Sequence, residues 1–316
     1  MTPTQLRTFV EIAATGSVRQ AAERLFVSPP AVSAALAALQ KELGVSLVQR
    51  EGRGLVITSQ GEVFASYARR ILGLLDEAVA AVAGGTDPER GRVRLAAVTT
   101  AGEHVVPGFL ASFRTRYEHV EVTLEVGNRA RVLEMLDNHE VDIAIGGRPP
   151  PLGRFCTKAT RPNNFVVVAA SSSNGQRRTR RRTARRVPSA ELERSVWLLR
   201  EPGSGTRATV LELLDDLNIV PPRLTLGSNG AIRESVKVGL GITLISRDAV
   251  GRELDNGDLE EWAIAGGPRP KSWHVVARMD EDLPPTARLF LDHLTAVEGG
   301  PNRFHPGDQS GDHGSR

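Results

Sequence analysis

The stretch Ala21-Ala22-Glu23-Arg24-Leu25-Phe26-Val27-Ser28-Pro29-Pro30-Ala31-Val32-Ser33 decides the fold of the N-terminal part of the chain. It contains the end of one helical pattern, a short connection and the start of another helical pattern. Ser17 and Gln20 have the spacing of a capping box, which predicts a helix over Val18 to Leu25. Ser28 is placed to cap the next helix, whose first turn tolerates Pro29. Two short helices joined by a tight turn predict a helix-turn-helix.

The sequence on either side of this motif completes a small domain. Apolar residues at helical spacing predict an amphipathic first helix over Gln5 to Thr15. After Gly44, alternating runs at 46–50 and 55–58 flank a glycine-rich turn, which predicts a two-stranded hairpin, or wing. We therefore predict an all-α winged helix-turn-helix domain over residues 1–58.

This domain is expected to bind double-stranded DNA, with the second helix of the motif in a major groove and the wing near phosphates or the minor groove. Residues 1–90 hold nine basic and nine acidic residues, so the expectation rests on geometry and not on net charge. The alternative is a small packing domain, and the order of the elements favours DNA binding. The expected contact residues are Ser17, Arg19, Ser28, Pro29, Pro30, Ser33, Arg50 and Arg53.

A long helix is predicted after the wing, from Ser59, with Glu62 completing a second capping box, to about Val82. Apolar residues on it follow the spacing of a coiled-coil seam. One chain cannot bury such a seam alone, so residues 59–85 are predicted to form a linker that makes a homodimer or homotetramer. The alternative is that the helix packs on the rest of its own chain. The seam residues are Phe64, Tyr67, Ile71, Leu74 and Ala78.

The remainder alternates short β-rich runs with helical patterns, which predicts an α/β fold with two parallel-sheet lobes. A last strand, Trp273 to Ala277, and a last helix, Pro285 to Val297, are expected to return to the first lobe. This places a two-lobed, periplasmic-binding-protein-like domain at 91–297, with lobe 1 at about 91–162 and 267–297 and lobe 2 at about 163–266. The Gly- and Pro-rich end, 298–316, is predicted to be disordered.

Ligands of open α/β sheets bind at the carboxyl ends of strands, where helix N-termini favour anions. Several loops with hydroxyl, amide or cationic side chains fall at such positions. They predict a small anionic effector in the cleft between the lobes, although loops of this composition are individually more typical of caps and turns. The expected effector-binding residues are Thr99, Thr100, Asn128, Arg148, Ser204, Thr206 and Asn229.

Composition excludes several classes of protein. Apolar residues make up 40% of the chain without an apolar run long enough to cross a bilayer, and no secretory signal is visible, which predicts a cytoplasmic protein without membrane contact. The single cysteine, Cys156, cannot form an intrachain disulfide and is interpreted as a buried or incidental thiol. The histidines His305 and His313 are too sparse to indicate a metal, and neither a metal site nor a bound cofactor is expected.

The basic character of the chain comes from one segment. Residues 171–186 hold seven of the 40 Lys and Arg and no acid, and the other 33 are outnumbered by 37 Asp and Glu. A solvated loop is the favoured interpretation of this segment. An additional DNA or phosphate contact and a local reading-frame excursion in the gene are the two alternatives.

The motif around Ala21 to Ser33, with Leu39, Leu43-Gly44-Val45, Arg50 and Thr58-Ser59-Gln60-Gly61-Glu62, resembles the signature of the LysR-type transcriptional regulators. The resemblance runs from about residue 3 to about residue 297. It implies a DNA-binding regulator that responds to a small molecule, with RNA polymerase as a candidate further partner. Pro29 stands where the family often has glutamine, and Ala34 where it often has a basic residue. We therefore expect binding to depend more on backbone contacts and DNA shape than on base-edge bonds.

Segments of the effector domain resemble the CbbR-type, carbon-fixation subgroup of this family. They are Val126-Gly127-Asn128-Arg129, Gly147-Arg148-Pro149-Pro150, Glu201-Pro202-Gly203-Ser204-Gly205-Thr206-Arg207, Ser228-Asn229-Gly230-Ala231-Ile232 and Trp273-His274-Val275-Val276. This resemblance implies control of carbon-metabolism genes, with a phosphorylated sugar or a nicotinamide nucleotide as effector.

The sequence argues against two alternative functions. An enzyme would use Ser204 as nucleophile or His104 as base, but Gly203-Ser204-Gly205 lacks the spacing of a nucleophile elbow and no catalytic constellation stands out. A solute-binding protein of transport would share the two lobes, but it would need export and would leave the helix-turn-helix without a purpose. No catalytic residue is therefore predicted.

Overall fold

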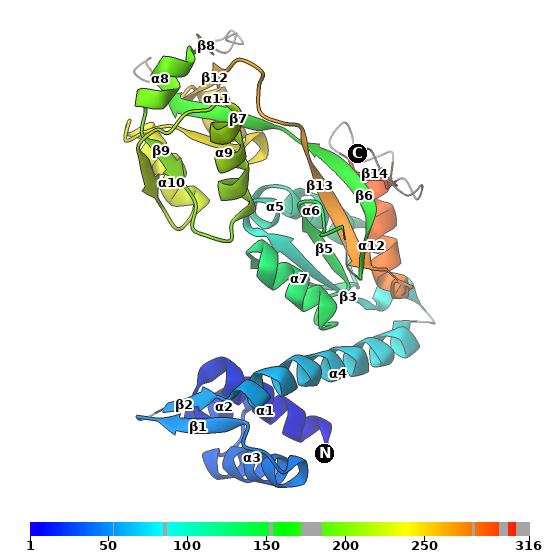
Figure 1. Cartoon of the computed structure of the whole chain (residues 1–316). Coiled ribbons are helices and arrows are strands. Elements are labelled where there is room, and N and C mark those ends of the chain that lie inside the picture. Colours follow the sequence, from blue (N-terminus) through cyan, green and yellow to red (C-terminus); the bar gives the residue numbers. More distant parts are fainter. Residues whose placement is uncertain are drawn as a thin grey trace.

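A computed structural model of the chain describes residues 1–52, 54–84, 87–151, 154–171, 185–279, 282–296 and 303–307. Three parts follow one another in Figure 1: an N-terminal domain, the long helix α4, and a domain of two lobes. The N-terminal domain lies at one end of α4, and the lobe that contains β3 lies along the other end. Among the described residues, no helix is long and apolar enough to span a membrane.

The N-terminal domain is the predicted winged helix-turn-helix. Its core consists of inward residues of all three helices, among them Phe9, Ala22 and Leu39. Ser17 accepts a hydrogen bond from the Gln20 amide and so caps α2, but its own amide donates to the Thr15 hydroxyl and not to Gln20, so the predicted capping box is only half formed. The elements are α1 (Pro3–Thr15), α2 (Val18–Leu25), α3 (Pro29–Leu43) and the antiparallel pair β1 (Val48–Glu51) and β2 (Gly54–Ile57).

Two predicted helix caps differ from the structure. Ser28 occupies the N-cap position of α3, but its hydroxyl makes no capping hydrogen bond. Helix α4 (Ser59–Gly84) is capped by Thr58 and not by Ser59, since the Gly61 amide donates to the Thr58 hydroxyl at 3.0 Å. Thr58 directly follows the wing strand, and its amide bonds back to Leu47 at 3.0 Å, which places its side chain over the first turn of the helix.

Lobe 1 is built on a six-stranded mixed sheet with the order β14-β6-β13-β5-β3-β4. Strands β4, β3 and β5 are parallel, whereas β13, β6 and β14 continue the sheet in antiparallel pairs. Successive residues of β3 face two different cores, so both faces of the sheet are covered. The elements are η1 (Pro88–Arg90), β3 (Arg92–Val98), α5 (Thr99–His104), α6 (Val106–Arg116), β4 (Glu121–Gly127), α7 (Arg129–Asp137), β5 (Ile143–Gly146), β6 (Phe155–Asn163), β13 (Lys271–Arg278), α12 (Pro285–Thr295) and β14 (His305–Pro306).

In lobe 2, the prediction of a parallel sheet is wrong for the main sheet, whose order is β11-β7-β12-β8. Strand β7 pairs antiparallel with both β11 and β12. The cause is that β7 enters the lobe from lobe 1, whereas β11 and β12 run back toward it. Among the described strands of this lobe, β9–β10 and β12–β8 are parallel pairs, and Trp197 of β9 also forms a parallel bridge with Ile242, directly before β11. The elements are β7 (Phe165–Ala170), β8 (Arg185–Arg186), α8 (Ser189–Arg194), β9 (Trp197–Leu199), α9 (Gly205–Asp216), β10 (Arg223–Thr225), α10 (Asn229–Lys237), β11 (Thr243–Ser246), α11 (Arg247–Asn256) and β12 (Leu259–Ala263).

The chain crosses between the lobes twice, from β6 to β7 and from β12 to β13. Side chains of lobe 2 bind both crossing strands. Asp248 of α11 accepts hydrogen bonds from Arg161 of β6 at 2.6 Å and from Trp273 of β13 at 2.7 Å. Ser246 donates to the Asn163 side chain at 2.7 Å. These contacts fix one angle between the lobes in this structure.

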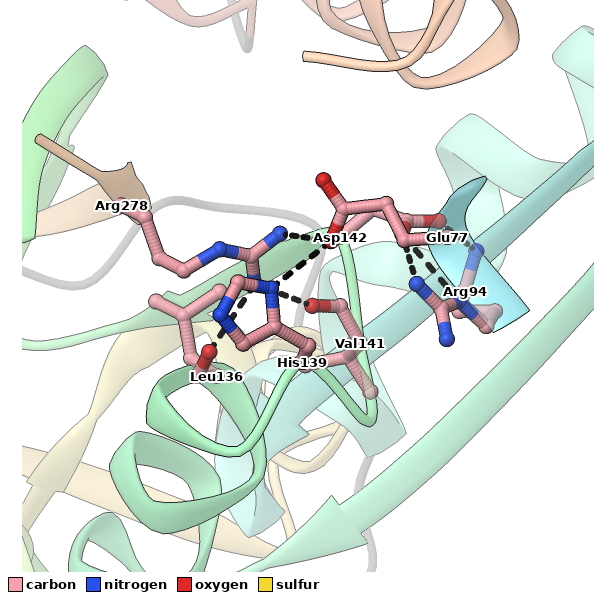
Figure 2. A network of polar contacts seen from close by, with 7 residues as sticks. All are labelled: Glu77, Arg94, Leu136, His139, Val141, Asp142 and Arg278. Carbon is pink, nitrogen blue, oxygen red and sulfur yellow. Dashed lines mark hydrogen bonds and ion pairs between the residues drawn. The ribbon is translucent and has the colours of Figure 1, made fainter. Parts of the chain in front are cut away.

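Helix α4 contacts lobe 1 of its own chain around Glu77. The alternative that this helix packs on the rest of its own chain therefore holds for this part of the helix. The Glu77 carboxylate lies 2.9 Å from Nδ1 of His139 and 2.7 Å from Nη2 of Arg278 (Figure 2), and both partner side chains are buried. Arg278 also donates to the carbonyls of Leu136 and Val141. We call Glu77, His139 and Arg278 the linker joint.

The prediction of a disordered end does not hold for residues 303–307. His305 and Pro306 form β14 on the edge of β6, and Phe304 is fully buried in the core of lobe 1. The aromatic ring of Phe304 anchors a segment whose composition alone indicates disorder. Residues 298–302 and 308–316 lie outside the described residues.

The arginine-rich segment is described only at its end, because residues 172–184 lie outside the described residues. Arg185 and Arg186 form β8 on the edge of β12. The guanidinium of Arg185 also bonds to Glu191 and stacks over the Trp262 ring, 5.1 Å from its centroid. For these two residues, the solvated-loop interpretation is replaced by an edge strand.

Candidate functional site

A cleft of about 680 Å³ opens between the lobes, a size suited to a small metabolite. It is bounded by the loops at the carboxyl ends of β3, β4 and β5, by the crossing strands β6 and β13, and by the first turn of α9. Six of the seven predicted effector-binding residues line it: Thr99, Thr100, Asn128, Arg148, Ser204 and Thr206.

Asn229 differs from its prediction, because it does not line the cleft. It is buried, donates to the Thr100 hydroxyl at 2.8 Å and accepts from Arg200 at 2.7 Å. The amide group is therefore committed to joining the two lobes behind the cleft. Thr100 belongs to lobe 1 and Asn229 to lobe 2, so this hydrogen bond holds the cleft at its present width.

Asn128 caps a helix in addition to lining the cleft. Its side chain accepts the amide hydrogen of Arg131 and so caps α7 at 2.9 Å. Ser204 occupies the N-cap position of α9, but its side chain accepts no capping hydrogen bond. The first-turn amides of α9 therefore face the cleft beside the Ser204 hydroxyl, an arrangement that favours a negatively charged ligand.

The charges along the cleft are unequal. Its lining contains four cationic side chains, Arg129, Arg148, Arg200 and Lys271, and two carboxylates, Glu201 and Glu212. Both carboxylates have partners: Glu201 binds Arg200 through two hydrogen bonds of 2.7 and 2.8 Å, and Glu212 binds Lys271. Hydrogen bonding to Arg200 lowers the pKa of Glu201. The lining therefore carries more cationic side chains than carboxylates, and two of its arginines, Arg129 and Arg148, lie on lobe 1.

The positive charge of the cleft affects the pKa of His274 on β13. Burial, followed by the charges of Arg148 and Arg129, lowers its pKa below the ordinary value of 6.5. The imidazole is thus neutral at neutral pH, and its Nδ1 lies 3.1 Å from the Thr157 hydroxyl of β6. At the floor of the cleft, His274 acts as a neutral hydrogen-bonding group.

Sequence reasoning missed several residues of this site. Arg200 and Lys271 were passed over because each looks like an ordinary surface charge. Thr157 and Thr160 were missed because β6 itself was not predicted, although its alternating β-formers could have indicated a strand. Gly307 also lines the cleft, from the segment that was expected to be disordered.

The DNA-facing residues predicted in the N-terminal domain lie mostly at its surface. Pro29, Pro30 and Ser33 are exposed along the first turns of α3, and Ser28 precedes them. Ser17 is half-buried at the start of α2. Arg19 is exposed and pairs with Glu23 on the same helix at 3.1 Å, and Arg50 is exposed on β1. Arg53 lies outside the described residues.

Helix α4 presents an apolar face without a partner in the described chain. Of the predicted seam residues, Tyr67, Ile71 and Leu74 are 58%, 45% and 54% exposed, and Ala78 is exposed as well. Phe64 differs, because its ring packs on Phe9 of the N-terminal core at a centroid distance of 5.4 Å. The exposed face also includes Val63, Leu75 and Val79, which the seam prediction left out.

A groove of about 570 Å³ adjoins this face, between the end of α3 and the first turns of α4. Leu43, Val45 and Val63 are among its lining residues. An apolar helix face continuous with an apolar groove is the kind of surface that a second protein chain covers.

A winged helix-turn-helix joined through a long helix to a two-lobed domain with a polar cleft defines a ligand-responsive DNA-binding regulator. The chain belongs to the LysR family of bacterial regulators. Residues 3–62 match the bacterial regulatory helix-turn-helix protein, lysR family, and residues 86–298 match the LysR substrate binding domain. It is thus a sequence-specific transcriptional regulator under the control of a small-molecule effector.

Among its relatives, the chain is similar to the HTH-type transcriptional regulator CbbR of Xanthobacter flavus, with 35% identity over 292 residues that cover 92% of this chain and 86% of that protein. It is also similar to the CcmR regulatory domain of Synechocystis PCC6803 in complex with 2-PG, with 28% identity and a TM-score of 0.56 over 66% of this chain and 98% of that one. The full-length CbnR structure with its target DNA shares the fold, with a TM-score of 0.66, 21% identity and coverage of 93% and 98%.

Proposed function

We propose that the effector is a small phosphorylated anion bound in the cleft between the lobes, a sugar phosphate or a nicotinamide nucleotide. The observation that carries this proposal is the excess of cationic side chains over carboxylates in the cleft lining, which includes Arg129 and Arg148 of lobe 1 and the first turn of α9. A phosphate group between them would meet arginine on one side and helix amides with the Ser204 hydroxyl on the other.

The remaining lining residues suit the rest of such a ligand. The hydroxyls of Thr99, Thr100 and Thr206 and the amide of Asn128 offer donors and acceptors for hydroxyl groups. The 2-PG complex of the similar CcmR domain supports the choice of an anion. Two relatives that are named RuBisCO operon transcriptional regulators, each 30% identical to this chain, support carbon-metabolism genes as targets.

DNA recognition is assigned to α3 and the wing. Ser28, Pro29, Pro30 and Ser33 would face the major groove, Ser17 and Arg19 the backbone beside it, and Arg50 with Arg53 the flanking phosphates or minor groove. Two such domains are needed for two half-sites, and the apolar face of α4 with its adjoining groove would supply the homodimer contact. Dimers of this kind can pair into a tetramer, and RNA polymerase is included among the proposed partners.

Regulation follows if the effector binds one arrangement of the lobes better than another. The Thr100–Asn229 bond and the Asp248 contacts hold the present arrangement. A ligand that draws Arg148 toward α9 would change the angle between the lobes. The linker joint attaches α4 to lobe 1, so a movement of lobe 1 would be transmitted to the DNA-binding domain.

Footprinting tests this proposal. The purified protein is bound to the intergenic DNA upstream of its own gene, with and without 2-PG, sugar phosphates and nicotinamide nucleotides. We expect a protected palindrome whose length changes with one phosphorylated compound. No protection at low salt would contradict the assigned DNA-binding surface, and protection that responds to none of the compounds would contradict the phosphorylated effector.

An arginine pair provides the matched control. Arg148→Ala is expected to weaken the response to the active compound by at least about tenfold, the loss of one charge-assisted hydrogen bond. Arg252→Ala removes an exposed arginine of α11 outside the cleft and should leave the response unchanged. Equal responses of the two variants would remove Arg148 from the site.

A further inference from the structure

The segment 303–307, here called the C-terminal strap, is attached to lobe 1 at three points. The Phe304 amide donates to the Leu294 carbonyl of α12 at 3.1 Å, and its ring packs against Phe109 of α6 at a centroid distance of 5.6 Å. His305 and Pro306 pair with β6, and the Gly307 amide donates to the Lys158 carbonyl at 2.8 Å. In Figure 1, β14 lies along the outer side of β6.

The strap sequence suits this pairing. Gly307 and Lys158 are hydrogen-bonded partners, so the alternation of an antiparallel ladder places His305 and Thr160 in the next hydrogen-bonded pair. Pro306 then falls at the intervening position, which needs no amide hydrogen. The one residue that cannot donate therefore stands where no donor is required.

Gly307 brings the strap to the cleft. It lines the cleft beside Thr157, whose hydroxyl bonds to His274. A Cβ atom at position 307 would lie 2.8 Å from the Thr157 carbonyl oxygen, so only a residue without a side chain allows this approach without a shift of backbone. The strap is consequently in direct contact with the part of β6 that faces the ligand.

The strap lies beyond the family's effector domain, whose match ends at residue 298. Without it, β6 would be an edge strand with unpaired backbone groups, and the site of Phe304 in the core would be empty.

We propose that the C-terminal strap is a working wall of the effector cleft. It holds β6, with Thr157 and Thr160, in the position that the ligand requires, and Phe304 is its positioning residue. The contribution to ligand binding rests on the proposed function of the cleft.

Truncations of the 316-residue chain test whether the strap holds β6 in place. One variant ends at residue 298 and lacks it, and the control ends at Gly307 and retains it. Hydrogen exchange of the β6 amides is the first measurement because it needs no ligand. The Thr160 amide is expected to exchange about 100-fold faster in the shorter variant and unchanged in the control, since only the former exposes the strand edge. Equal exchange rates in the two truncations would contradict the proposal that the strap protects the edge of β6.

Point variants keep the test valid if the shorter protein fails to fold. Phe304→Ala should accelerate exchange at Thr160, Phe304→Leu should restore most of the protection, and Gly307→Val should affect β6 near Thr157. Normal exchange in Phe304→Ala would contradict the anchor.

Calorimetric titration with 2-PG and with inorganic phosphate then measures whether the strap contributes to ligand affinity in the cleft. We expect loss of affinity in the 298 truncation and in Phe304→Ala, and parental affinity in the 307 truncation. Unchanged affinity in Phe304→Ala would contradict the proposal that the strap supports ligand binding. If neither probe binds the parent protein, 2-PG and inorganic phosphate are excluded as ligands and the role of the strap in binding them is contradicted. Hydrogen exchange still decides whether the strap holds β6, and the footprinting panel still decides whether the effector is phosphorylated.

Discussion

Glu77 and Arg278 are separated by 201 positions in the sequence, and their charged groups lie 2.7 Å apart. Glu77 belongs to α4, which continues from the DNA-binding domain, and Arg278 to β13, which crosses between the lobes of the effector domain. Their side chains are only 13% and 7% exposed. The ion pair is therefore a buried link between the two functional halves of the regulator.

Removal of this link is expected to be costly. Glu77→Ala removes the carboxylate that His139 and Arg278 share at a buried site, which should lower the free energy of unfolding by about 3 kcal/mol. Urea titration followed by circular dichroism measures the loss. Asp76→Ala, on the neighbouring residue, is the control, because its pair with Arg7 is half-exposed and should contribute less than about 1 kcal/mol. Similar losses in the two variants would show that the joint is not a buried link.

Two helical glycines are expected to respond to alanine with opposite signs. A Cβ at Gly73 of α4 would lie 2.3 Å from the Asn138 carbonyl oxygen, whereas a Cβ at Gly108 of α6 would meet nothing within 4 Å. Gly73→Ala should therefore separate α4 from lobe 1 and destabilise the protein. Gly108→Ala should stabilise it by up to about 1 kcal/mol through helix propensity. Thermal unfolding compares the two, and a stabilised Gly73→Ala would contradict the close approach.

His274 should make the protein less stable in acid. Its pKa in the folded protein is below the ordinary 6.5, so the unfolded chain binds a proton first as the pH falls. The destabilisation is absent at pH well above 6.5, grows as the pH falls below that value, and levels off below the folded pKa. It amounts to less than about 1.4 kcal/mol per pH unit, the limit for one proton. His274→Gln should show a smaller loss between pH 7.5 and 5.5 in urea titrations, and an identical loss would exclude this origin.

DNA affinity should fall steeply with salt. Pro29 and Ala34 stand at positions of α3 that offer no side-chain donor to a base, so phosphate contacts carry more of the binding. Fluorescence anisotropy from 50 to 300 mM salt measures the slope of affinity against salt concentration. Arg50→Ala, on the wing, should reduce that slope by about one phosphate contact. A salt-insensitive affinity would contradict the proposed readout.

One charge placed on the apolar face of α4 should dissociate the proposed homodimer. Leu74→Asp places a carboxylate in the middle of the apolar face and should yield monomers, with DNA affinity reduced in parallel. Ser66→Asp adds the same charge to an exposed polar position of the same helix and serves as the control. Light scattering measures the mass, and a Leu74→Asp variant of parental mass would place the dimer contact elsewhere.

The N-terminal domain shows how far local sequence information reaches. The capping of α2 by Ser17, the tight connection at Phe26 and the apolar spacing of α3 all involve residues within a few positions of one another. Interactions between residues this close in the chain can be inferred from sequence spacing alone, and so the helix-turn-helix could be predicted. Even here, the choice between Thr58 and Ser59 as the cap of α4 depended on where the wing ends.

The cleft was predicted in part, for the same reason. Loops that follow strands and precede helices can be located from the sequence, and six of the seven expected residues do line the cleft. Asn229 has the same local signal, yet its amide is taken by Thr100 of the other lobe, 129 positions away. A pattern cannot show which of two similar loops finds a distant partner.

The sequence by itself determined the order of the domains, the helix-turn-helix and the family, because these depend on periodicity, caps and short motifs. Only the tertiary structure decided the antiparallel sheet of lobe 2, the linker joint and the C-terminal strap. Each of these is a pairing between segments far apart in the chain. Such a pairing is selected by the free energy of the whole packed fold, in which Phe304 finds a core and Glu77 finds Arg278, and no local pattern contains that information.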